Sequence, residues 1–279
     1  MSVALKFHKV KKKFDQLEAL KGVSLEIKEG EFFALLGQNG AGKTTLINCL
    51  AGVTRRDSGD IEVFDKNIDA APTFAKTNVG IVAQEVAFDP FFGPAEILRM
   101  QRGLFGMRQN EEHLDWLLKK LGLEDKKHVR SRQLSGGMRR RLMIAKALVH
   151  EPKVLILDEP TAGVDVELRQ NLWKFMEELR QKHGVTILLT THYLEEAQAL
   201  ADRIAIIHKG EVIVNEEKKQ LLKRQKRIVE VETSQGEHET FELEHGQSPL
   251  DKIRNRHDIE DITIREPKLE DIFLDLTKA

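Results

Sequence analysis

The chain has 279 residues, of which 41% are hydrophobic and 32% are charged, and its formal net charge at pH 7 is −1. This length is enough for one large domain and a smaller one. A net charge so close to zero argues against a nucleic-acid binder that relies on a strongly basic surface. The only cysteine, Cys49, excludes an intramolecular disulfide and fits a reducing compartment.

Membrane and targeting signals are not apparent in the sequence. No apolar run approaches the roughly 18–20 residues that a membrane-spanning helix needs. The first residues, Met1 to Lys6, are too polar for a secretory signal. We therefore expect a soluble chain, and any membrane process that it serves would need spans from another subunit.

The first part of the chain has the hydrophobic pattern of short strands, with a helix over residues 45–51. The predicted strands cover residues 3–10, 23–27, 32–36, 61–64 and 79–83. The run at 32–36 is entirely apolar and has the length of a strand.

Between the strand at 32–36 and the helix lies a phosphate-binding loop. It has the pattern G-x-x-x-x-G-K-T and consists of Gly37, Gln38, Asn39, Gly40, Ala41, Gly42, Lys43 and Thr44. Its glycines let backbone N–H groups approach phosphate oxygens closely, and the helix N-terminus faces the same anion. Lys43 is placed to bring a positive charge to the β- and γ-phosphates, and the Thr44 hydroxyl to ligate Mg²⁺.

From residue 85 to residue 152 helical periodicity replaces the strands, with predicted helices near 97–104, 114–121 and 136–149. In the third helix we expect Leu142 and Leu148 to point inward and Arg139, Arg140 and Arg141 mostly outward. The motif Leu134-Ser135-Gly136-Gly137 opens this helix. Such a helix start can bind an anion, although Ser135 could equally be an N-cap and nothing more.

A segment rich in phenylalanine, Val86 to Pro94, directly follows Gln84. Its two prolines and its glycine exclude a regular helix or a central strand. Two interpretations stay open. In one, the phenylalanines form a small core under the helical insert; in the other, they line a groove that receives a helix of a membrane subunit.

The strand–helix pattern returns after Pro152. An apolar strand at 153–157 ends in Asp158 and Glu159, at the sheet edge where ligands bind in open α/β sheets. Asp158 is placed to hold Mg²⁺, and Glu159 to polarise a water for attack on the γ-phosphate. The later predicted elements are a helix at 166–182, a strand at 185–190, a helix at 194–201 and strands at 204–207 and 211–214.

A basic connector from Lys218 to Arg227 separates this part from the C-terminal residues. A solvated linker is the simplest interpretation, with weak attraction to anionic lipid headgroups as the alternative. Beyond it, alternating residues at 228–233 and 240–243 predict strands of a small α+β unit.

The order of these motifs, followed by His192, resembles the ATP-binding cassette (ABC) ATPase family over residues 1 to about 220. The run from Glu151 to Asp165, and the stretch Pro267 to Leu274, resemble the ABC-2 type exporter branch, which includes YadG-like and drug-resistance ATPases. The implied fold class is α/β, with a RecA-like P-loop NTPase core, a helical ABC subdomain and a small C-terminal α+β accessory domain. The implied boundaries are 1–222 for the ATPase domain and 223–279 for the accessory domain, with the core at 1–84 and 153–222 and the helical subdomain at 85–152.

The resemblance also implies roles for single residues. Gln84 would reach Mg²⁺ and the attacking water, His192 would contact the γ-phosphate, and Phe14 would stack on adenine. Ser135 and Gly137 would bind the γ-phosphate of the ATP held by a partner subunit, and Asp165 would lie in the loop that crosses the dimer interface. The implied catalytic residues are Glu159, His192 and Gln84. The implied Mg²⁺ ligands are Thr44, Gln84 and Asp158. The implied ATP-binding residues are Phe14, Gly37, Asn39, Gly40, Ala41, Gly42, Lys43, Thr44, Thr45, Ser135, Gly136, Gly137 and Asp165.

The resulting hypothesis is an ATP-hydrolysing subunit that dimerises on ATP and drives a separate ABC-2 type membrane permease. Its cofactors would be ATP and Mg²⁺, its partners a second copy of the chain and the permease, without nucleic acid. It would be cytoplasmic and peripheral on the inner face of the cell membrane. A soluble ABC protein acting on nucleic acid or ribosomes is the alternative, but the chain has no long coiled-coil insertion and no second cassette. A pseudo-ATPase is disfavoured because every catalytic position is filled.

Overall fold

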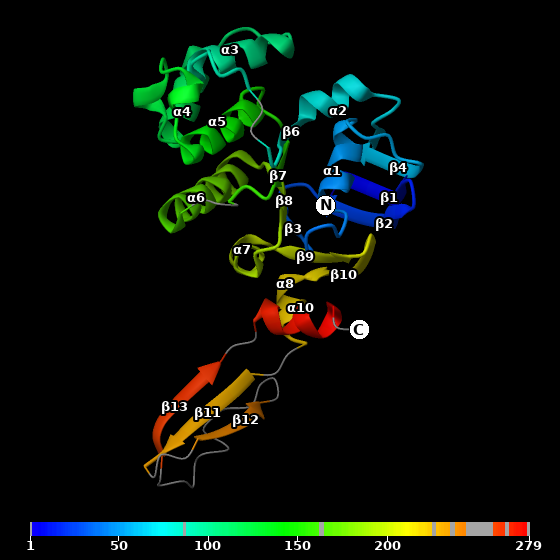
Figure 1. Ribbon diagram of the computed structural model, residues 1–279, viewed down its shortest axis with the longest axis vertical. Coiled ribbons are helices and arrows are strands. Elements are labelled where there is room, and N and C mark those ends of the chain that lie inside the picture. Colours follow the sequence, from blue (N-terminus) through cyan, green and yellow to red (C-terminus); the bar gives the residue numbers. More distant parts are fainter. Residues whose placement is uncertain are drawn as a thin grey trace. The chain divides into compact units, whose positions relative to one another are not determined.

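The computed structural model describes residues 2–85, 88–161, 165–224, 227–234, 238–243, 259–265 and 268–277. Its chain separates into two compact units, residues 1–215 and 216–279 (Figure 1). No described helix has the length and hydrophobicity of a membrane span. The larger unit contains two sheets and a group of helices, and the smaller unit is mainly a three-stranded sheet.

The central element of the larger unit is a six-stranded sheet with the order β10-β9-β3-β8-β7-β6. Strand β3 pairs in parallel with β8 and β9, and β7 pairs in parallel with β8 and β6. All residues of β3, β7 and β8 are buried, and for β7 the continuous apolar run predicted this. The strands are β3 (Phe32–Leu36), β6 (Val79–Val82), β7 (Val154–Asp158), β8 (Thr186–Thr191), β9 (Arg203–His208) and β10 (Glu211–Glu217).

A second, antiparallel sheet has the order β2-β1-β4-β5. Its strands are β1 (Val3–Phe14), β2 (Leu17–Lys28), β4 (Ser58–Val63) and β5 (Lys66–Asn67). Helix α1 (Lys43–Ala51) shares one hydrophobic cluster with β1, β2 and the central sheet. The helix ends at Gly52 in the left-handed conformation. Helix α2 (Pro72–Asn78) leads into β6.

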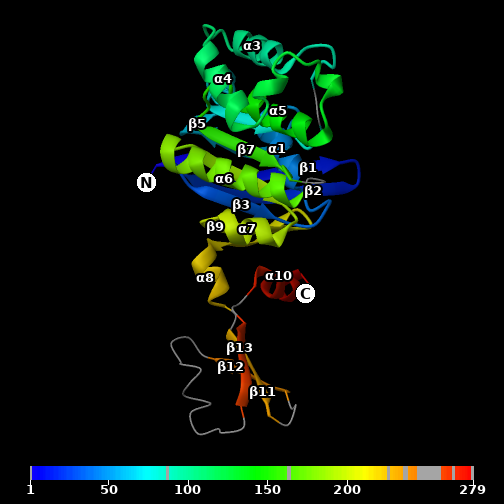
Figure 2. The same cartoon turned by 90° about the vertical axis from the view of Figure 1, so that its left-hand side faces the viewer.

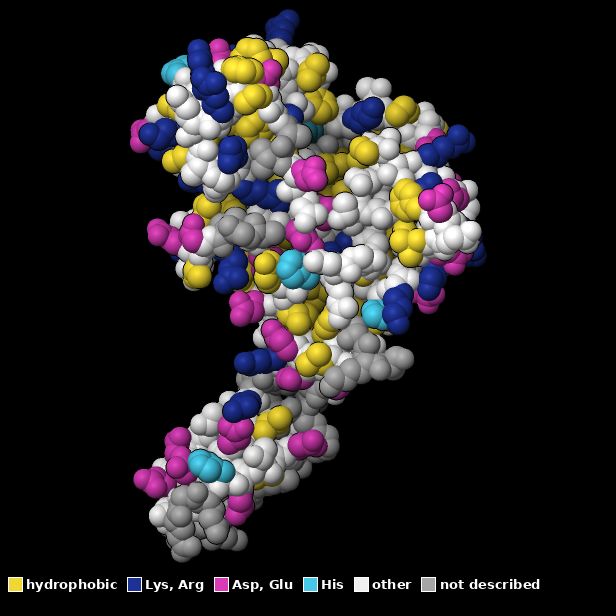
Figure 3. Space-filling view, viewed as in Figure 1, with side chains coloured by type: hydrophobic (Ala, Val, Ile, Leu, Met, Phe, Trp, Pro, Cys, Tyr) yellow, Lys and Arg dark blue, Asp and Glu magenta, His cyan; other side chains and the backbone are white. Residues whose placement is uncertain are grey.

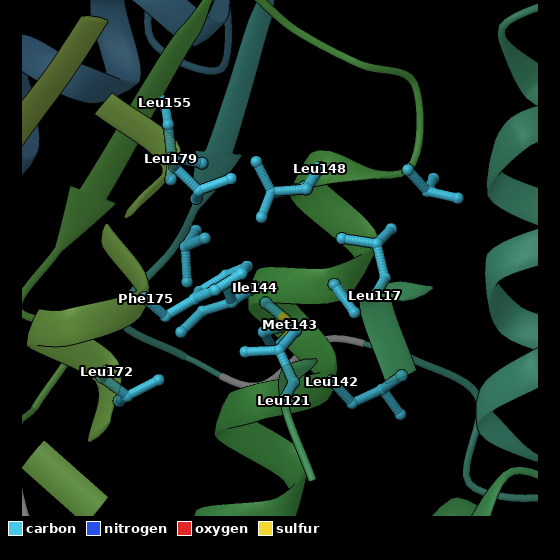
Figure 4. Packing of buried hydrophobic residues seen from close by; sticks show 14 of the residues in the cluster. Leu117, Leu121, Leu142, Met143, Ile144, Leu148, Leu155, Leu172, Phe175 and Leu179 are labelled. Carbon is cyan, nitrogen blue, oxygen red and sulfur yellow. The ribbon is translucent and has the colours of Figure 1, made fainter. Parts of the chain in front are cut away.

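A helical insert lies between β6 and β7 in sequence and forms its own lobe of the larger unit (Figures 1 and 2). It consists of α3 (Pro94–Leu104), α4 (Glu111–Lys120), the short 3₁₀ turns η1 (Glu124–Lys126) and η2 (Ser131–Gln133), and α5 (Gly136–Leu148). Leucines of α4 and α5 pack against Leu172, Phe175 and Leu179 of α6 (Val166–His183) and against Leu155 of β7 (Figure 4). This shared hydrophobic cluster fixes the insert on the sheet.

One expectation for the insert was wrong. Arg140 was expected to point outward with its neighbours, yet its side chain is only 6% exposed, while Arg139 and Arg141 are partly exposed. Packing accounts for the difference, because the Arg140 guanidinium donates to backbone carbonyls that follow β6 and end β7, whereas Arg141 donates to carbonyls at the end of α4.

Residues 216–279 contain an antiparallel sheet of order β12-β11-β13. Its strands are β11 (Arg227–Thr233), β12 (His238–Leu243) and β13 (Ile259–Arg265), and two helices are described, α8 (Lys218–Leu222) and α10 (Leu269–Thr277). Val229, Val231 and Leu243 form a small core. In the segment interpreted as a solvated linker, Lys219, Lys223 and Arg224 are exposed, but residues 218–222 form helix α8 and Leu221 is fully buried. Residues 225 and 226 and Pro267 lie outside the described residues.

Candidate functional site

Four parallel strands deliver the candidate catalytic residues to one edge of the central sheet. The phosphate loop follows β3, Gln84 follows β6, Glu159 follows β7 and His192 follows β8. Parallel strands have their carboxyl ends on the same side, so these four segments converge there, as expected for a ligand site in an open α/β sheet.

The phosphate loop runs from Gly37 to Gly42, and α1 begins at Lys43. Two glycines are required by the space around them. A Cβ on Gly37 would lie 2.6 Å from the carbonyl oxygen of Ile207, and one on Gly42 would lie 2.6 Å from that of Ala19. Gly42 also has a φ of 111°, which side chains disfavour. The loop is therefore held tightly against β2 and β9.

Lys43, the first residue of α1, is buried, with 4% exposure, and its side chain turns back toward the loop. Its Nζ donates hydrogen bonds to the carbonyl oxygens of Gly37 and Gln38, at 2.7 and 3.2 Å. The same Nζ lies 3.3 Å from Oε1 of Glu159. Thr44 is exposed and Thr45 is half-buried at the start of α1. The loop thus presents a hydroxyl and a buried ammonium from consecutive residues.

Two carboxylates close β7. Asp158 is 1% exposed, and its Oδ1 accepts a hydrogen bond from the hydroxyl of Thr190 on β8. Glu159 is 7% exposed, and its N–H donates to the carbonyl oxygen of Thr190 at 3.0 Å. Glu159 has a φ of 48°, the left-handed region, which is strained for a residue with a side chain and common at functional sites.

Glu159 also approaches His192. Its Oε1 lies 3.2 Å from His192 Nδ1, which is ion-pair distance, although the two atoms lack the geometry of a hydrogen bond. One carboxylate oxygen of Glu159 therefore lies near Lys43 Nζ on one side and near the imidazole of His192 on the other.

The remaining predicted site residues occupy separate positions. Ser135 caps α5, with Oγ accepting a hydrogen bond from the N–H of Met138 at 3.2 Å, and Gly136 and Gly137 form the first turn. Asp165 caps α6 in the same way, through the N–H of Leu168 at 2.8 Å. Within the described ranges, no hydrogen bond or ion pair joins Ser135 or Asp165 to the phosphate loop. Residues 162–164, between Thr161 and Asp165, lie outside the described residues.

Phe14 is at the end of β1 and is 45% exposed, with Lys12 Nζ 5.1 Å from its ring centre. An isolated phenylalanine is ordinarily a core residue, so this exposure is unusual. Gln84 is exposed, and its carbonyl oxygen accepts a hydrogen bond from Arg140 at 3.1 Å.

Sequence reasoning missed two residues of this site, Thr190 and Arg140. Thr190 is an unremarkable strand residue until its hydroxyl meets Asp158. Arg140 donates to backbone carbonyls around Asp158 and Glu159. Burial lowers the pKa of Arg140, and the negative charges of Asp158 and Glu159 oppose that shift. The sequence holds no signal that selects Arg140 over Arg141, because Arg141 also shares a helical face with buried residues, Ala145 and Leu148.

The phenylalanine-rich segment divides between its two interpretations. Phe88 packs against the hydrophobic cluster of the insert, whereas Phe91 is 61% and Phe92 36% exposed. Hydrophobic side chains are visible on the surface of the lobe formed by α3, α4 and α5 (Figure 3). Val86 and Ala87 lie outside the described residues.

Comparison with known proteins places these observations in a family. A family model described as ABC transporter matches residues 20–162. The Nod factor export ATP-binding protein I of Burkholderia thailandensis is 41% identical over 216 residues, covering 76% of this chain and 71% of that protein. The linearmycin resistance ATP-binding protein LnrL of Bacillus subtilis is 35% identical over 270 residues, covering 95% of this chain and 84% of that protein.

Solved structures give the same picture. A dimeric ATP-binding cassette, described as a post-hydrolysis state bound to ADP and Pi, has 27% sequence identity and a TM-score of 0.70, covering 77% of this chain and 98% of its own. An ATP-binding subunit of an ABC transporter has a TM-score of 0.77 and covers 98% of this chain and 99% of its own, at 23% identity. The second likeness concerns the fold alone.

Proposed function

This chain belongs to the ABC transporter family, whose cassettes bind and hydrolyse ATP, and we propose that it is the ATPase subunit of an exporter with a separate ABC-2 type membrane subunit. The convergence of Lys43, Glu159 and His192 at one sheet edge carries the ATPase part of the proposal. The names of the relatives, a Nod factor exporter and a linearmycin resistance protein, support export.

Lys43 and Glu159 perform the central steps in this proposal. The Lys43 ammonium, held by carbonyls of its own loop, binds the β- and γ-phosphates as a point charge. The Glu159 carboxylate accepts a proton from the attacking water, and its burial limits competing solvent. His192 contacts the γ-phosphate from the end of β8, and Gln84 orients the water. Phe14 stacks on adenine with its exposed ring.

Thr44, Asp158 and Gln84 are the residues that would hold Mg²⁺. Their donors are oxygens, which Mg²⁺ prefers, and Mg²⁺ characteristically takes one or two carboxylates together with substrate phosphates. Asp158 fits this role, because the Thr190 hydroxyl fixes Oδ1 and so orients the carboxylate. Bound with ATP, Mg²⁺ neutralises negative charge on the phosphates.

The capped start of α5 supports a composite site in a homodimer. Ser135, Gly136 and Gly137 begin a 13-residue helix whose N-terminal N–H groups favour an anion. These residues have no contact with the phosphate loop of their own chain among those described, so in this proposal they bind the γ-phosphate of ATP on the second copy. Asp165, at the start of α6, lies in the loop that crosses the same interface.

A cavity of about 1260 Å³ supports a docking place for a cytoplasmic helix of the membrane subunit (Figure 3). It lies between α1 and α2 on one side and α3 and α5 on the other, and its apolar lining includes Leu50, Ile68, Ala75, Leu104 and Phe105. Of its acidic residues, Asp57 and Asp69 pair with Lys12 and Arg56, and Asp60 accepts a hydrogen bond from Asn67. Arg55 and Lys76 also line it, without an ion pair to any residue in the described part of the chain. This charge balance favours an amphipathic helix that carries an acidic residue.

The boundaries of the ATPase domain, 1–222, and of the accessory domain, 223–279, belong to this proposal. So does a cytoplasmic position on the inner face of the membrane, reached through the permease. The test is co-purification from a detergent extract followed by ATPase assay. A polytopic membrane protein that stimulates hydrolysis supports export. Recovery of ribosomes or nucleic acid in its place would favour the soluble alternative.

A further inference from the structure

The buried Arg140 side chain makes an unusual set of contacts. It forms no ion pair with any described residue, and each nitrogen of its guanidinium donates to backbone carbonyl oxygens. The contacts are Nε to Pro160 at 2.9 Å, Nη1 to Ala83 and Gln84 at 2.6 and 3.1 Å, and Nη2 to Asp158 and Glu159 at 2.8 and 2.7 Å. A guanidinium has five N–H donors, so all of them are used.

These carbonyls need a partner because of where they lie. The parallel ladder between β6 and β7 ends with the pair Val82 and Leu157. β6 ends at Val82, so the β6–β7 ladder provides no further backbone partners for the carbonyl oxygens of Ala83 and Gln84 or for those of the residues after Leu157. Arg140 enters from α5 and satisfies the carbonyls on both strands. It therefore holds the carboxyl ends of β6 and β7 together.

Glu159 is the residue most dependent on this arrangement. Its positive φ of 48° is unfavourable for an L-residue and persists only when surrounding contacts fix it. Two backbone bonds do so from opposite sides. The Glu159 N–H donates to Thr190, and the Glu159 carbonyl accepts from Arg140. The direction of the Glu159 carboxylate toward Lys43 and His192 follows from this fixed turn.

The 3₁₀ turn η2, which precedes the helix that carries Arg140, holds the far end of the segment after Gln84. Ser131 is fully buried, and its Oγ donates to the carbonyl of Asp89 at 2.8 Å. The N–H of Ser131 donates to the carbonyl oxygen of Phe92 at 2.9 Å, and the N–H of Arg132 donates to the carbonyl oxygen of Pro90 at 3.1 Å. Residues 131–140 therefore form hydrogen bonds to both ends of the segment that follows β6, and Ser135 lies between the two sets of donors in sequence.

We propose that Arg140 is a positioning residue. It links the start of α5 at Ser135, the segment at Gln84 and the strained turn at Glu159, so that the three move together. The regulatory part of this inference rests on the proposed composite site. When the γ-phosphate of a second copy's ATP binds at Ser135, α5 is drawn toward that copy, and Arg140 transmits the movement to the Glu159 backbone. Hydrolysis is then coupled to dimer closure through one side chain that contacts neither ATP nor the water.

Arg140→Met and Arg140→Lys test this inference, with Arg141→Met as the matched control. Arg141 is on the same helix and also donates to carbonyls, at Leu121 and Gly122, but these lie within the insert. Misplacement of a catalytic group by about 1 Å can cost on the order of 100-fold. We therefore expect Arg140→Met to lower kcat roughly 10–100-fold while the Kd for ATP changes less than about threefold. Arg141→Met should keep kcat near wild type.

Arg140→Lys separates alignment from charge. A lysine keeps the positive charge but cannot reach five carbonyls from its three donors, so it should recover only part of kcat. In a Glu159→Gln background, Arg140→Met should also reduce the fraction of ATP-bound dimer measured by light scattering. If Arg140→Met does not fold, the kcat of Arg140→Lys is compared with that of Arg141→Met at a temperature well below the melting temperatures of both variants. Equal kcat values in Arg140 and Arg141 variants, or losses of ATP affinity that parallel the losses of kcat, would overturn the inference. An inactive wild type would refute the proposed function instead.

Discussion

The ammonium of Lys43 lies 3.3 Å from the carboxylate of Glu159, although the two residues belong to distant parts of the chain. Lys43 begins α1, after β3 and the phosphate loop, and Glu159 follows β7, which lies two strands away from β3 in the sheet. Both side chains are buried, so each charge offsets part of the cost of removing the other from water. The pair joins the residue proposed to bind phosphate to the residue proposed to act as base.

Replacing Glu159 with glutamine should stop hydrolysis but not binding. Glu159→Gln keeps the shape and the backbone bonds to Thr190 and Arg140, but it removes the proton acceptor. The ATPase rate should fall about 10²–10⁴-fold, while ATP binding persists and dimers accumulate. Glu167→Gln, on the exposed start of α6, is the matched control. A hydrolysis rate for Glu159→Gln near that of the control would remove Glu159 from the mechanism.

Mixed dimers can test whether each ATP site contains residues of both copies. Lys43→Ala and Ser135→Arg should each disable a homodimer. If Ser135 acts across the interface, a dimer of one variant with the other has one intact site and one doubly damaged site. In a Glu159→Gln background it should trap a single ATP, counted by nucleotide extraction from the isolated mixed dimer. Two trapped nucleotides, or none at any mixing ratio, would contradict the composite site.

Phe91 and Phe88 allow docking and folding to be separated. Phe91 is 61% exposed, so Phe91→Ser should leave the melting temperature unchanged. Phe91 does not line the cavity proposed for docking, so this variant tests whether the interface extends beyond the cavity. If Phe91 is an interface anchor, the membrane subunit should bind roughly tenfold more weakly, equivalent to about 1.4 kcal/mol. Phe88 packs on the insert core, and Phe88→Ser should destabilise the chain by about 1–3 kcal/mol. Unfolding caused by Phe91→Ser would support the small-core interpretation of the whole segment.

His150 should make stability depend on pH. It is buried and stacked on Phe105, with ring centres 3.9 Å apart, and burial lowers its pKa from the ordinary value of 6.5. As the pH falls, His150 is therefore protonated in the unfolded chain before it is protonated in the folded chain. The stability present above pH 6.5 is consequently lost as the pH falls below 6.5. Urea midpoints measured between pH 8 and pH 5 should decline, and His150→Gln should make the decline shallower. His8→Gln, at an exposed histidine, should keep the wild-type slope, and an identical slope in His150→Gln would contradict the assignment.

Truncation after residue 222 tests the proposed domain boundary. The C-terminal residues contain none of the proposed phosphate-binding or catalytic residues, and the sheet β12-β11-β13 has its own small core. The shortened chain should therefore bind ATP with the Kd of the full chain, as measured by calorimetry. Loss of binding in a truncated protein that still melts cooperatively would show that the boundary is misplaced.

The phosphate-loop motif and the positions of most strands along the chain could be predicted from the sequence, because their signals are local. Residues 37–44 are consecutive, so the motif formed by their glycines and Lys43 can be recognised without knowledge of distant residues. Continuous apolar runs likewise identify β3 and β7 as buried strands, and the carboxylates after β7 lie at the sheet edge by topology alone.

Only the tertiary structure decided how the segments at that edge are held together. The hydrogen bond from Thr190 to Asp158, the left-handed turn at Glu159 and the five carbonyls around Arg140 all depend on strands and helices that meet from distant parts of the chain. Arg139, Arg140 and Arg141 are identical in type, and their neighbours in sequence do not distinguish them. Their side chains point in different directions because an α-helix turns each successive residue by about 100°. Only packing against β6 and β7 determines which arginine contacts the carbonyl oxygens there.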